Sequence, residues 1–171
     1  MTQTVQWLDD REQSAWRSFL HMHAQLTAQL GRELQESSNL SISDYSVLVQ
    51  LSDQPDQRVR ILELARALQW EKSRLSHQLT RMQQRGLLER SSCKEDRRGA
   101  FVVLTDAGRE ALEAVAPAHV ASVRRYLFDD LSLEQLEVFT AVCDGVLERL
   151  PHCDAQSDAA LCGEPSGASA G

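Results

Sequence analysis

The chain has 171 residues, of which 42% are hydrophobic and 25% are charged, as expected for one folded domain or one domain with a dimerisation arm. No apolar run approaches the roughly 18 residues of a membrane span, and residues 1–11 lack the basic-then-apolar order of a signal peptide. The four cysteines form no CxxC pair, which argues against a zinc ribbon. A disulfide framework is not expected either, because the rest of the chain can build a core by itself. We therefore expect a cytoplasmic protein without a membrane partner.

The N-terminal part of the sequence predicts two helices. Apolar residues recur near the 3.6-residue helical period over residues 9–36. Ser41 with Asp44 has the spacing of a capping box, which predicts a second helix that runs to about Ser52. A loop follows, and the segment 58–60 is too short to classify by its own pattern.

The centre of the sequence predicts a pair of short helices followed by a β-hairpin. The helices cover residues 61–68 and 71–85, and Gly86 supplies the left-handed position that often ends a helix. Residues 87–93 and 100–104 are predicted to be strands, with a charged hairpin tip between them.

Two longer helices are predicted after the hairpin. Thr105 can cap a helix that runs to about Phe128, with Pro117 expected to kink it. Ser132 begins another helix, which runs to about residue 150 and has one apolar seam. The seam consists of Leu136, Phe139, Cys143, Val146 and Leu150. Residues 151–171 show no periodicity, and we expect a disordered tail there.

This order of elements is that of a winged helix–turn–helix, in which the second helix of the pair enters the major groove of DNA. At 100° per residue, Leu75, Leu79 and Met82 fall on one side of the 71–85 helix and should be buried. The opposite side carries short polar and basic residues, and no acid stands between Lys72 and Arg85. Candidate major-groove contacts are Ser73, Arg74, Ser76, His77 and Arg81, with Thr80 and Gln84 on the same face. An ordinary solvated face is the alternative, but such a face would be expected to alternate Glu with Lys or Arg.

The distribution of charge agrees with a DNA-binding centre. Residues 58–109 carry 12 Lys and Arg against 6 Asp and Glu, a net charge of +6, and the remainder carries −13, which together give the −7 of the whole chain. A basic segment between acidic arms fits a nucleic-acid-binding face. At the hairpin tip, Arg97 and Arg98 follow Asp96, which can hold a guanidinium ready for a narrow minor groove. A polar hairpin turn is the alternative there.

Two stretches of the sequence resemble the MarR family of bacterial transcription regulators. Residues 96–108, DRRGAFVVLTDAG, match that family's wing signature DRRxxxVxLTxxG. Residues 64–68, followed by Ser73, Leu75 and residues 81–88, look like its helix–turn–helix. The resemblance covers about residues 10–150. One departure is Glu71, which stands where the family often has Ser; its carboxylate would lie near phosphate or pair with Lys72 or Arg74, and the sequence leaves these alternatives open.

The resemblance implies a mainly α fold with a small β-hairpin wing, in which residues 37–104 form the winged helix–turn–helix domain. Residues 9–36 and 105–150 would form an intertwined helical dimerisation region. It further implies a homodimer, a repressor in function, that binds a palindromic operator in double-stranded DNA, with Arg98 in the minor groove and Asp96 supporting it. No cofactor is implied.

A small-molecule effector that releases the DNA is the family's common mechanism, so the resemblance implies a pocket between the dimer helices and the winged domain. Candidates by position alone are Trp16, His23, Tyr45 and Trp70, each of which can equally be a core residue. The sequence names no ligand.

Other site chemistries find little support. The five histidines include no HxxxH pair, so we expect no metal site. No GxSxG, HExxH or phosphate-cradling Gly-rich loop occurs, so we expect no catalytic residue. Cys93 and Cys143 can be read as oxidant sensors or as small hydrophobes. A winged helix that binds a partner protein is the remaining alternative, but an acid-free helix face does not favour it.

Overall fold

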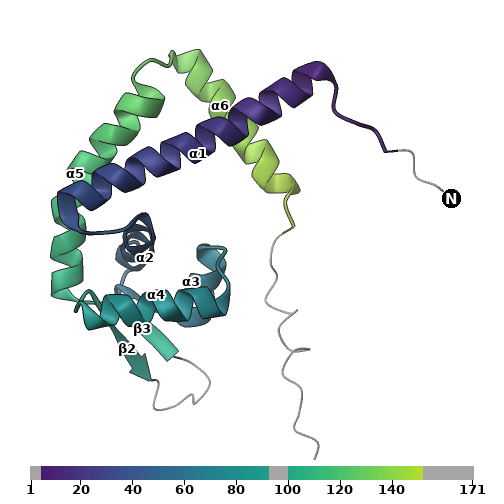
Figure 1. Cartoon of the computed structure of the whole chain (residues 1–171). Coiled ribbons are helices and arrows are strands. Elements are labelled where there is room, and N and C mark those ends of the chain that lie inside the picture. The colour runs from purple at the N-terminus through teal and green to yellow at the C-terminus, as the bar shows by residue number, and fades with distance from the viewer. Residues whose placement is uncertain (1–4, 93–99, 152–171) are drawn as a thin grey trace, which may run out of the picture. The chain divides into compact units, whose positions relative to one another are not determined.

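The computed structural model of the chain describes residues 5–92 and 100–151 and is mainly helical with one small sheet (Figure 1). The helices are α1 (Asp10–Ser38), α2 (Ile42–Ser52), α3 (Ile61–Ala67), α4 (Lys72–Gln84), α5 (Asp106–Val123), the π-helix η1 (Arg124–Phe128) and α6 (Leu133–Arg149). The strands are β1 (Arg58–Arg60), β2 (Leu88–Ser92) and β3 (Ala100–Leu104). This confirms the predicted winged helix–turn–helix fold class. The predicted hairpin tip and the predicted disordered tail from residue 152 onward lie outside the described residues.

Side-chain caps begin several helices where the sequence places them. The predicted capping box of Ser41 and Asp44 starts α2, and that of Ser132 and Gln135 starts α6. The Thr105 hydroxyl accepts a hydrogen bond from the Gly108 backbone N–H at 3.0 Å at the start of α5. Each cap satisfies a backbone N–H that has no partner within the helix and contributes about 1 kcal/mol.

The sheet has one strand more than the predicted hairpin. Strand order is β1-β3-β2 and both pairs are antiparallel, with Arg60 opposite Phe101 and Leu88 opposite Leu104. The segment that forms β1 has too few residues to show a period, and its extended form depends on hydrogen bonds to β3. The helix predicted to reach Phe128 also differs, because its α-helical part ends at Val123 and a π-helical turn continues it.

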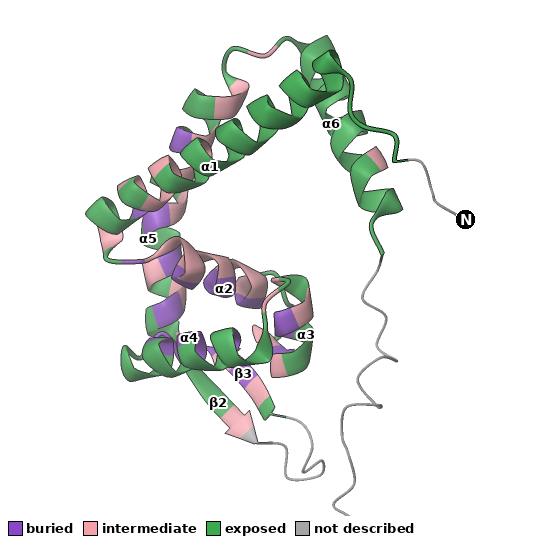
Figure 2. Ribbon diagram, turned by 45° about the vertical axis from the view of Figure 1, so that its right-hand side comes forward, coloured by how far each residue is buried: buried purple, intermediate pink, exposed green. Residues whose placement is uncertain are grey.

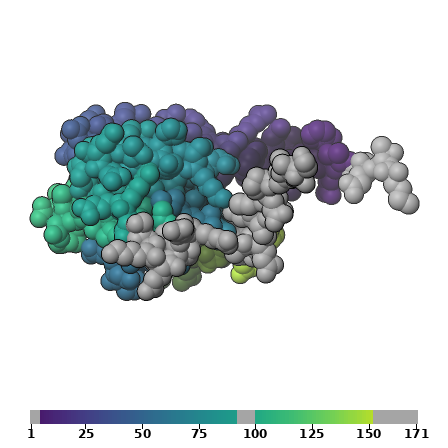
Figure 3. Space-filling view, turned by 90° about the horizontal axis from the view of Figure 1, so that it is seen from below, coloured from purple at the N-terminus to yellow at the C-terminus, as the bar shows by residue number. Residues whose placement is uncertain are grey.

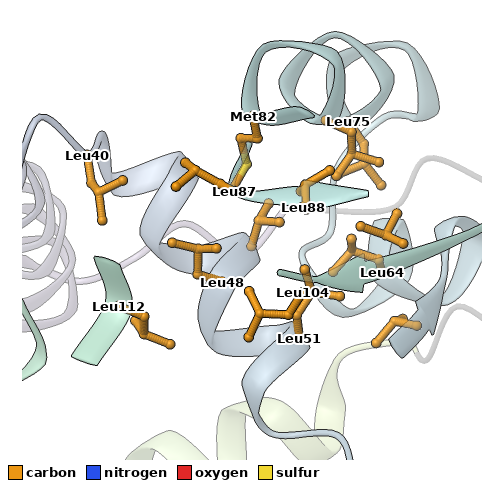
Figure 4. Packing of buried hydrophobic residues seen from close by; sticks show 14 of the residues in the cluster. Leu40, Leu48, Leu51, Leu64, Leu75, Met82, Leu87, Leu88, Leu104 and Leu112 are labelled. Atoms are coloured by element: carbon orange, nitrogen blue, oxygen red, sulfur yellow. The ribbon is translucent and has the colours of Figure 1, made fainter. Parts of the chain in front are cut away.

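The core lies between α2, α3, α4, the sheet and the first half of α5 (Figure 4). Figure 4 shows Leu75 and Met82 descending from α4 toward Leu87 and Leu88, with Leu48 on the α2 side. Among the described residues, ten side chains are fully buried, nearly all of them Leu or Val. Each such burial contributes about 1.5–3 kcal/mol, so this region carries its own hydrophobic core.

Gly108 shows how closely α5 approaches the sheet. A Cβ atom at this position would lie 2.0 Å from the Leu87 backbone oxygen and 2.9 Å from a Leu104 methyl carbon. Only glycine allows this approach, which gives the last glycine of the DRRGAFVVLTDAG stretch a packing role.

Contacts divide the chain into two units, Met1–Asp130 and Leu131–Gly171. Within the first unit, α1 packs on α5 through its C-terminal half, whereas its N-terminal half is exposed (Figure 2). In the second unit, α6 has no buried residue. Among the helices of the described residues, none combines the length and apolar character needed to cross a membrane.

Candidate nucleic-acid interface

Helix α4 separates a buried apolar side from an exposed polar side, as predicted. Leu75, Leu79 and Met82 have no exposed surface, and they hold the helix against the core. The candidate contact residues Ser73, Arg74, Ser76, His77 and Arg81 are all exposed. Figure 3 views the molecule from the side on which α4 and the wing strands lie, and teal residues of these elements form much of that surface. The structure therefore brings the five predicted residues together on one accessible helix face.

The start of α4 is held by aromatic packing and backbone rather than by a side-chain cap. Glu71 occupies the N-cap position with extended backbone, and its carboxylate makes no capping hydrogen bond. The guanidinium carbon of Arg74 lies 4.4 Å from the centre of the Trp70 ring, within the range of a cation–π contact. Trp70 therefore orients Arg74 at the beginning of the exposed face.

Strand β2 braces the middle of α4. The Arg90 guanidinium donates hydrogen bonds to the Ser76 carbonyl at 2.8 Å and to the Thr80 hydroxyl at 3.1 Å. Sequence reasoning missed Arg90, although the period of two along a strand places it on the same face as the buried Leu88, which is a signal for a side chain that reaches toward α4. This brace ties the orientation of the helix to that of the wing.

A second basic group lies at the root of the wing. The guanidinium carbon of Arg58 lies 3.7 Å from the centre of the Phe101 ring, and that of Arg60 lies 5.0 Å from it. Both arginines belong to β1, which the sequence pattern did not identify. The three side chains share one face of the sheet, the face that alternates with the buried Val59 and Val102.

The predicted minor-groove residues Asp96, Arg97 and Arg98 lie outside the described residues. The strands that lead to them are described, and the last pair in register is Ser92 with Ala100. The antiparallel hairpin that would carry the tip is thus confirmed.

A buried polar contact joins α4 to α2. Asp44 and Gln78 are each 4% exposed, and the Gln78 side-chain amide donates a hydrogen bond of 2.6 Å to Asp44. The Gln78 carbonyl accepts a hydrogen bond from Arg81. Sequence reasoning placed Arg81 on the exposed face but missed its buried partner. Helical spacing puts Gln78 beside Leu75 and Met82, but a polar side chain was not expected to be buried there.

Comparison with known proteins agrees with this geometry. The sequence profile of the MarR family matches residues 40–99. The transcriptional regulator HosA of Escherichia coli is 32% identical over 126 residues, which cover 73% of this chain and 88% of HosA. This chain belongs to the MarR family.

Two solved structures of MarR family transcriptional regulators from Streptomyces coelicolor are also similar. AbsC is 45% identical with a TM-score of 0.80, covering 84% of this chain and 97% of AbsC. Sco3205, whose structure is a complex with DNA, is 36% identical with a TM-score of 0.84, covering 91% of this chain and 97% of Sco3205. The chain is thus a winged helix–turn–helix, DNA-binding transcription regulator rather than an enzyme, as predicted.

The four candidate effector residues of this MarR-family chain do not line one cavity. Trp16 and His23 lie on the exposed half of α1, linked through Phe19 by ring stacking at 5.8 and 6.1 Å between ring centres. Tyr45 packs against His119 of α5 with 4.3 Å between ring centres. Trp70 lies in the turn between α3 and α4, where it contacts Arg74.

A cavity of about 400 Å³ lies between α1 and α5. Its lining residues are Leu30, Glu33, Leu34, Glu36, Ser37, Ala118, His119 and Ser122. Hydrogen bonds from Ser122, Tyr126 and Gln29, with the nearby Arg125 charge, lower the pKa of Glu33 to about 2. Burial lowers the pKa of His119, so this wall of the cavity carries an anionic carboxylate and a histidine that favours its neutral form.

Metal-binding side chains are not gathered anywhere in the described part of the chain: residues 5–92 and 100–151 contain no cluster of three or more His, Cys, Asp or Glu arranged to hold an ion. Of the two candidate redox residues, Cys143 is a free and exposed thiol on α6, and Cys93 lies outside the described residues.

Proposed function

We propose that the protein is a homodimeric transcriptional repressor that binds a roughly palindromic operator in double-stranded DNA. The observation that carries the proposal is the exposed, acid-free face of α4. In this arrangement α4 lies in the major groove, and Ser73, Arg74, Ser76, His77 and Arg81 provide its contacts. Arg and His can donate to guanine acceptors, and serine hydroxyls can bind phosphate or base edges. The DNA complex of Sco3205, a related protein of the same fold, supports this assignment.

The wing provides the second contact in this proposal. Arg98 enters the minor groove, with Asp96 and Arg97 beside it, because a narrow groove concentrates negative potential that attracts a guanidinium. Replacement of Arg98 by Ala should weaken binding and lower the slope of log K against log salt by about one unit. If the salt slope and the affinity are both unchanged, the wing does not contact DNA through Arg98.

Exposed apolar surface on the terminal helices supports the homodimer. On α1, Trp16, Phe19 and Leu20 are each about half exposed. The 17 residues of α6 bury nothing within the chain, and an amphipathic helix of that length is marginal in water without a packing partner. A second copy can cover both surfaces, and a two-fold dimer presents two copies of α4 about one DNA turn apart.

The cavity between α1 and α5 is the proposed effector site. Tyr45, one of the four predicted effector residues, contacts the cavity wall through His119. Trp16 and His23 are instead proposed to face the second copy, and Trp70 to orient Arg74. The two DNA-binding lobes of the dimer can stand at a spacing that fits DNA or at one that does not. An effector that binds only the second arrangement would weaken operator binding, to the extent that its affinity differs between the two arrangements.

Selection of bound fragments from a random pool of double-stranded DNA tests the proposal. We expect enrichment of a palindrome whose half-sites are about one helical turn apart, together with a dimer mass in sedimentation. Transcription in vitro from a promoter that contains the enriched site should fall when the protein is added. No enrichment at moderate salt would overturn the operator proposal and favour a winged helix that binds a partner protein.

A further inference from the structure

The contact between α2 and α4 contains a buried polar cluster that lies behind the exposed face. Asp44 and Gln78 stand 34 positions apart in the chain, and each is 4% exposed. Buried polar groups are costly unless paired, and well-packed apolar side chains at such sites are often at least as stabilising. The presence of this pair behind α4 therefore calls for a role beyond stability.

The Asp44 carboxylate is the acceptor in all of the hydrogen bonds described here. Its Oδ2 accepts from the Ser41 backbone N–H and hydroxyl at 2.8 Å each, and from the Arg85 guanidinium at 2.9 Å. Its Oδ1 accepts from the Gln78 Nε2 at 2.6 Å. A carboxylate has no hydrogen to donate, so it can bind only the NH₂ end of the Gln78 amide.

This constraint fixes the other end of the same amide. Because the NH₂ group of Gln78 faces Asp44, its carbonyl oxygen faces α4's outer edge and accepts from the Arg81 guanidinium. Arg81 is long and exposed, and such a side chain has many rotamers in the absence of a partner. The Gln78 carbonyl holds it in one of them.

We propose that Asp44 and Gln78 are positioning residues that orient Arg81 for base readout without touching DNA themselves. The inference rests on the proposed function in one respect, the assignment of Arg81 to the DNA interface. Asp44 sets the direction of the Gln78 amide, and the amide sets the pose of the guanidinium. The specificity of the operator thus depends on a carboxylate in the helix before the helix–turn–helix.

Substitution of Asp44 by Asn tests whether the contact orients Arg81 or only holds α2 against α4. The Asp44→Asn side chain keeps the shape and, with its oxygen in place of Oδ2, the acceptor for Ser41 and Arg85, but it puts an NH₂ group where Oδ1 met Gln78. The Gln78 amide then loses its partner or turns round, and a turned amide directs N–H groups at Arg81. We expect about ten-fold weaker binding to the selected operator and a relaxed base preference at the position that Arg81→Ala also relaxes.

The change of charge in Asp44→Asn should by itself increase the affinity for DNA, which is opposite to the expected loss of affinity. Removal of a negative charge near α4 by itself favours binding to phosphate. Asp53→Asn is the matched control, because Asp53 is exposed at the end of the same helix α2 and should leave affinity and base preference as they are. A loss in Asp44→Asn that is absent in Asp53→Asn therefore reflects hydrogen-bond direction.

A double variant reverses the direction of the contact. In Asp44→Asn with Gln78→Glu, the NH₂ group of residue 44 can donate to the new carboxylate, which can still accept from Arg81. We expect the double variant to recover the base preference of the wild type within about two-fold in affinity. If Asp44→Asn does not fold, the double variant decides alone: a wild-type preference supports the proposal, and a preference like that of Arg81→Ala overturns it.

A comparison of Asp44→Asn in the wild-type protein and in an Arg81→Ala protein distinguishes orientation of Arg81 from stabilisation of the α2–α4 contact. In an Arg81→Ala protein, Asp44→Asn should cause no further change in base preference, whereas a clamp that only holds α2 to α4 would lower affinity equally in both backgrounds. Equal losses overturn the proposal. Unchanged affinity and preference in Arg81→Ala alone overturn the DNA assignment of Arg81 and the positioning role with it, and enrichment by the wild type then shows whether the operator proposal survives.

Discussion

Helices α4 and α6 are of similar length but differ completely in burial. The 13 residues of α4 bury four side chains, and the 17 residues of α6 bury none (Figure 2). Both carry apolar residues at helical spacing, so their patterns look alike in the sequence. The difference is that the core which receives α4 is made by the same chain.

The two regions differ in whether their apolar side chains are covered within the chain. The winged part closes a Leu-rich core with Leu112 and Val115 of α5 and Leu34 of α1, all within one chain. The exposed half of α1 and all of α6 retain apolar surface that water does not favour. Under the proposed homodimer, substitutions in the two regions should respond differently to protein concentration.

The largest effect is expected from Phe139→Glu on the apolar seam of α6. An unpaired carboxylate buried in the dimer interface costs several kcal/mol, so the dissociation constant of the dimer should rise at least about 100-fold. Sedimentation velocity across a concentration series measures this change. Ala141→Glu, on the opposite side of the same helix, is the control and should leave the dimer intact; equal dissociation of both variants would contradict the seam.

A smaller effect is expected from Leu79→Ala in the core of the winged part. Leu79 has no exposed surface, and its truncation should lower the free energy of unfolding by about 3 kcal/mol. Denaturant unfolding measures the loss, which should be the same at every protein concentration. Gln83→Ala, on the exposed side of α4, should stay within about 0.5 kcal/mol of the wild type. If the loss of unfolding free energy instead increases on dilution, the stability of this core depends on dimerisation.

Gly108 and Gly31 allow a further test of how tightly α5 and α1 pack against their neighbours. Gly108→Ala places a Cβ atom 2.0 Å from the Leu87 oxygen, so it should lower the free energy of unfolding by about 2 kcal/mol. Gly31→Ala is the matched control in α1, where the nearest atom would be the Ile42 Cβ at 4.0 Å. Because alanine is the better helix former, this control should raise stability by about 0.5–1 kcal/mol. Thermal unfolding of both variants tests the pair, and a neutral Gly108→Ala would show that α5 can shift away from the sheet.

The sequence predicted features that depend on near neighbours and missed those that depend on distant ones. The capping box of Ser41 and Asp44 spans three residues, and it was found. The second role of Asp44, as acceptor for Gln78, joins residues 34 positions apart and has no local signal. Strand β1 was missed for the same reason, since its partner β3 lies far along the chain and begins only at Ala100. The exposed face of α4 was predicted because a helix repeats its faces at short range. Gln78 lies on the buried side of the same repeat, three residues after Leu75, but its polar side chain gave no reason to expect burial.

The smallest effect is expected at Glu33, which lies in the half of α1 that packs on α5. Glu33 accepts hydrogen bonds from Ser122 and Tyr126, and these with Gln29 and Arg125 lower its pKa from 4.5 to about 2. A folded-state pKa below the unfolded value means that the contact stabilises the fold above about pH 4.5 and loses that effect as the pH falls toward 2.

The difference in unfolding free energy between wild type and Glu33→Gln should therefore be constant near neutral pH and shrink between pH 4.5 and 2. Unfolding measured across this range tests it, with Glu110→Gln, an exposed glutamate of α5, as the control for loss of one charge. A difference that persists to pH 2 would contradict the lowered pKa. Since Glu33 anchors α1 to α5 within one chain while Trp16 and Phe19 are exposed, this contact marks the boundary along α1 between the part packed within the chain and the part that the proposed second copy would cover.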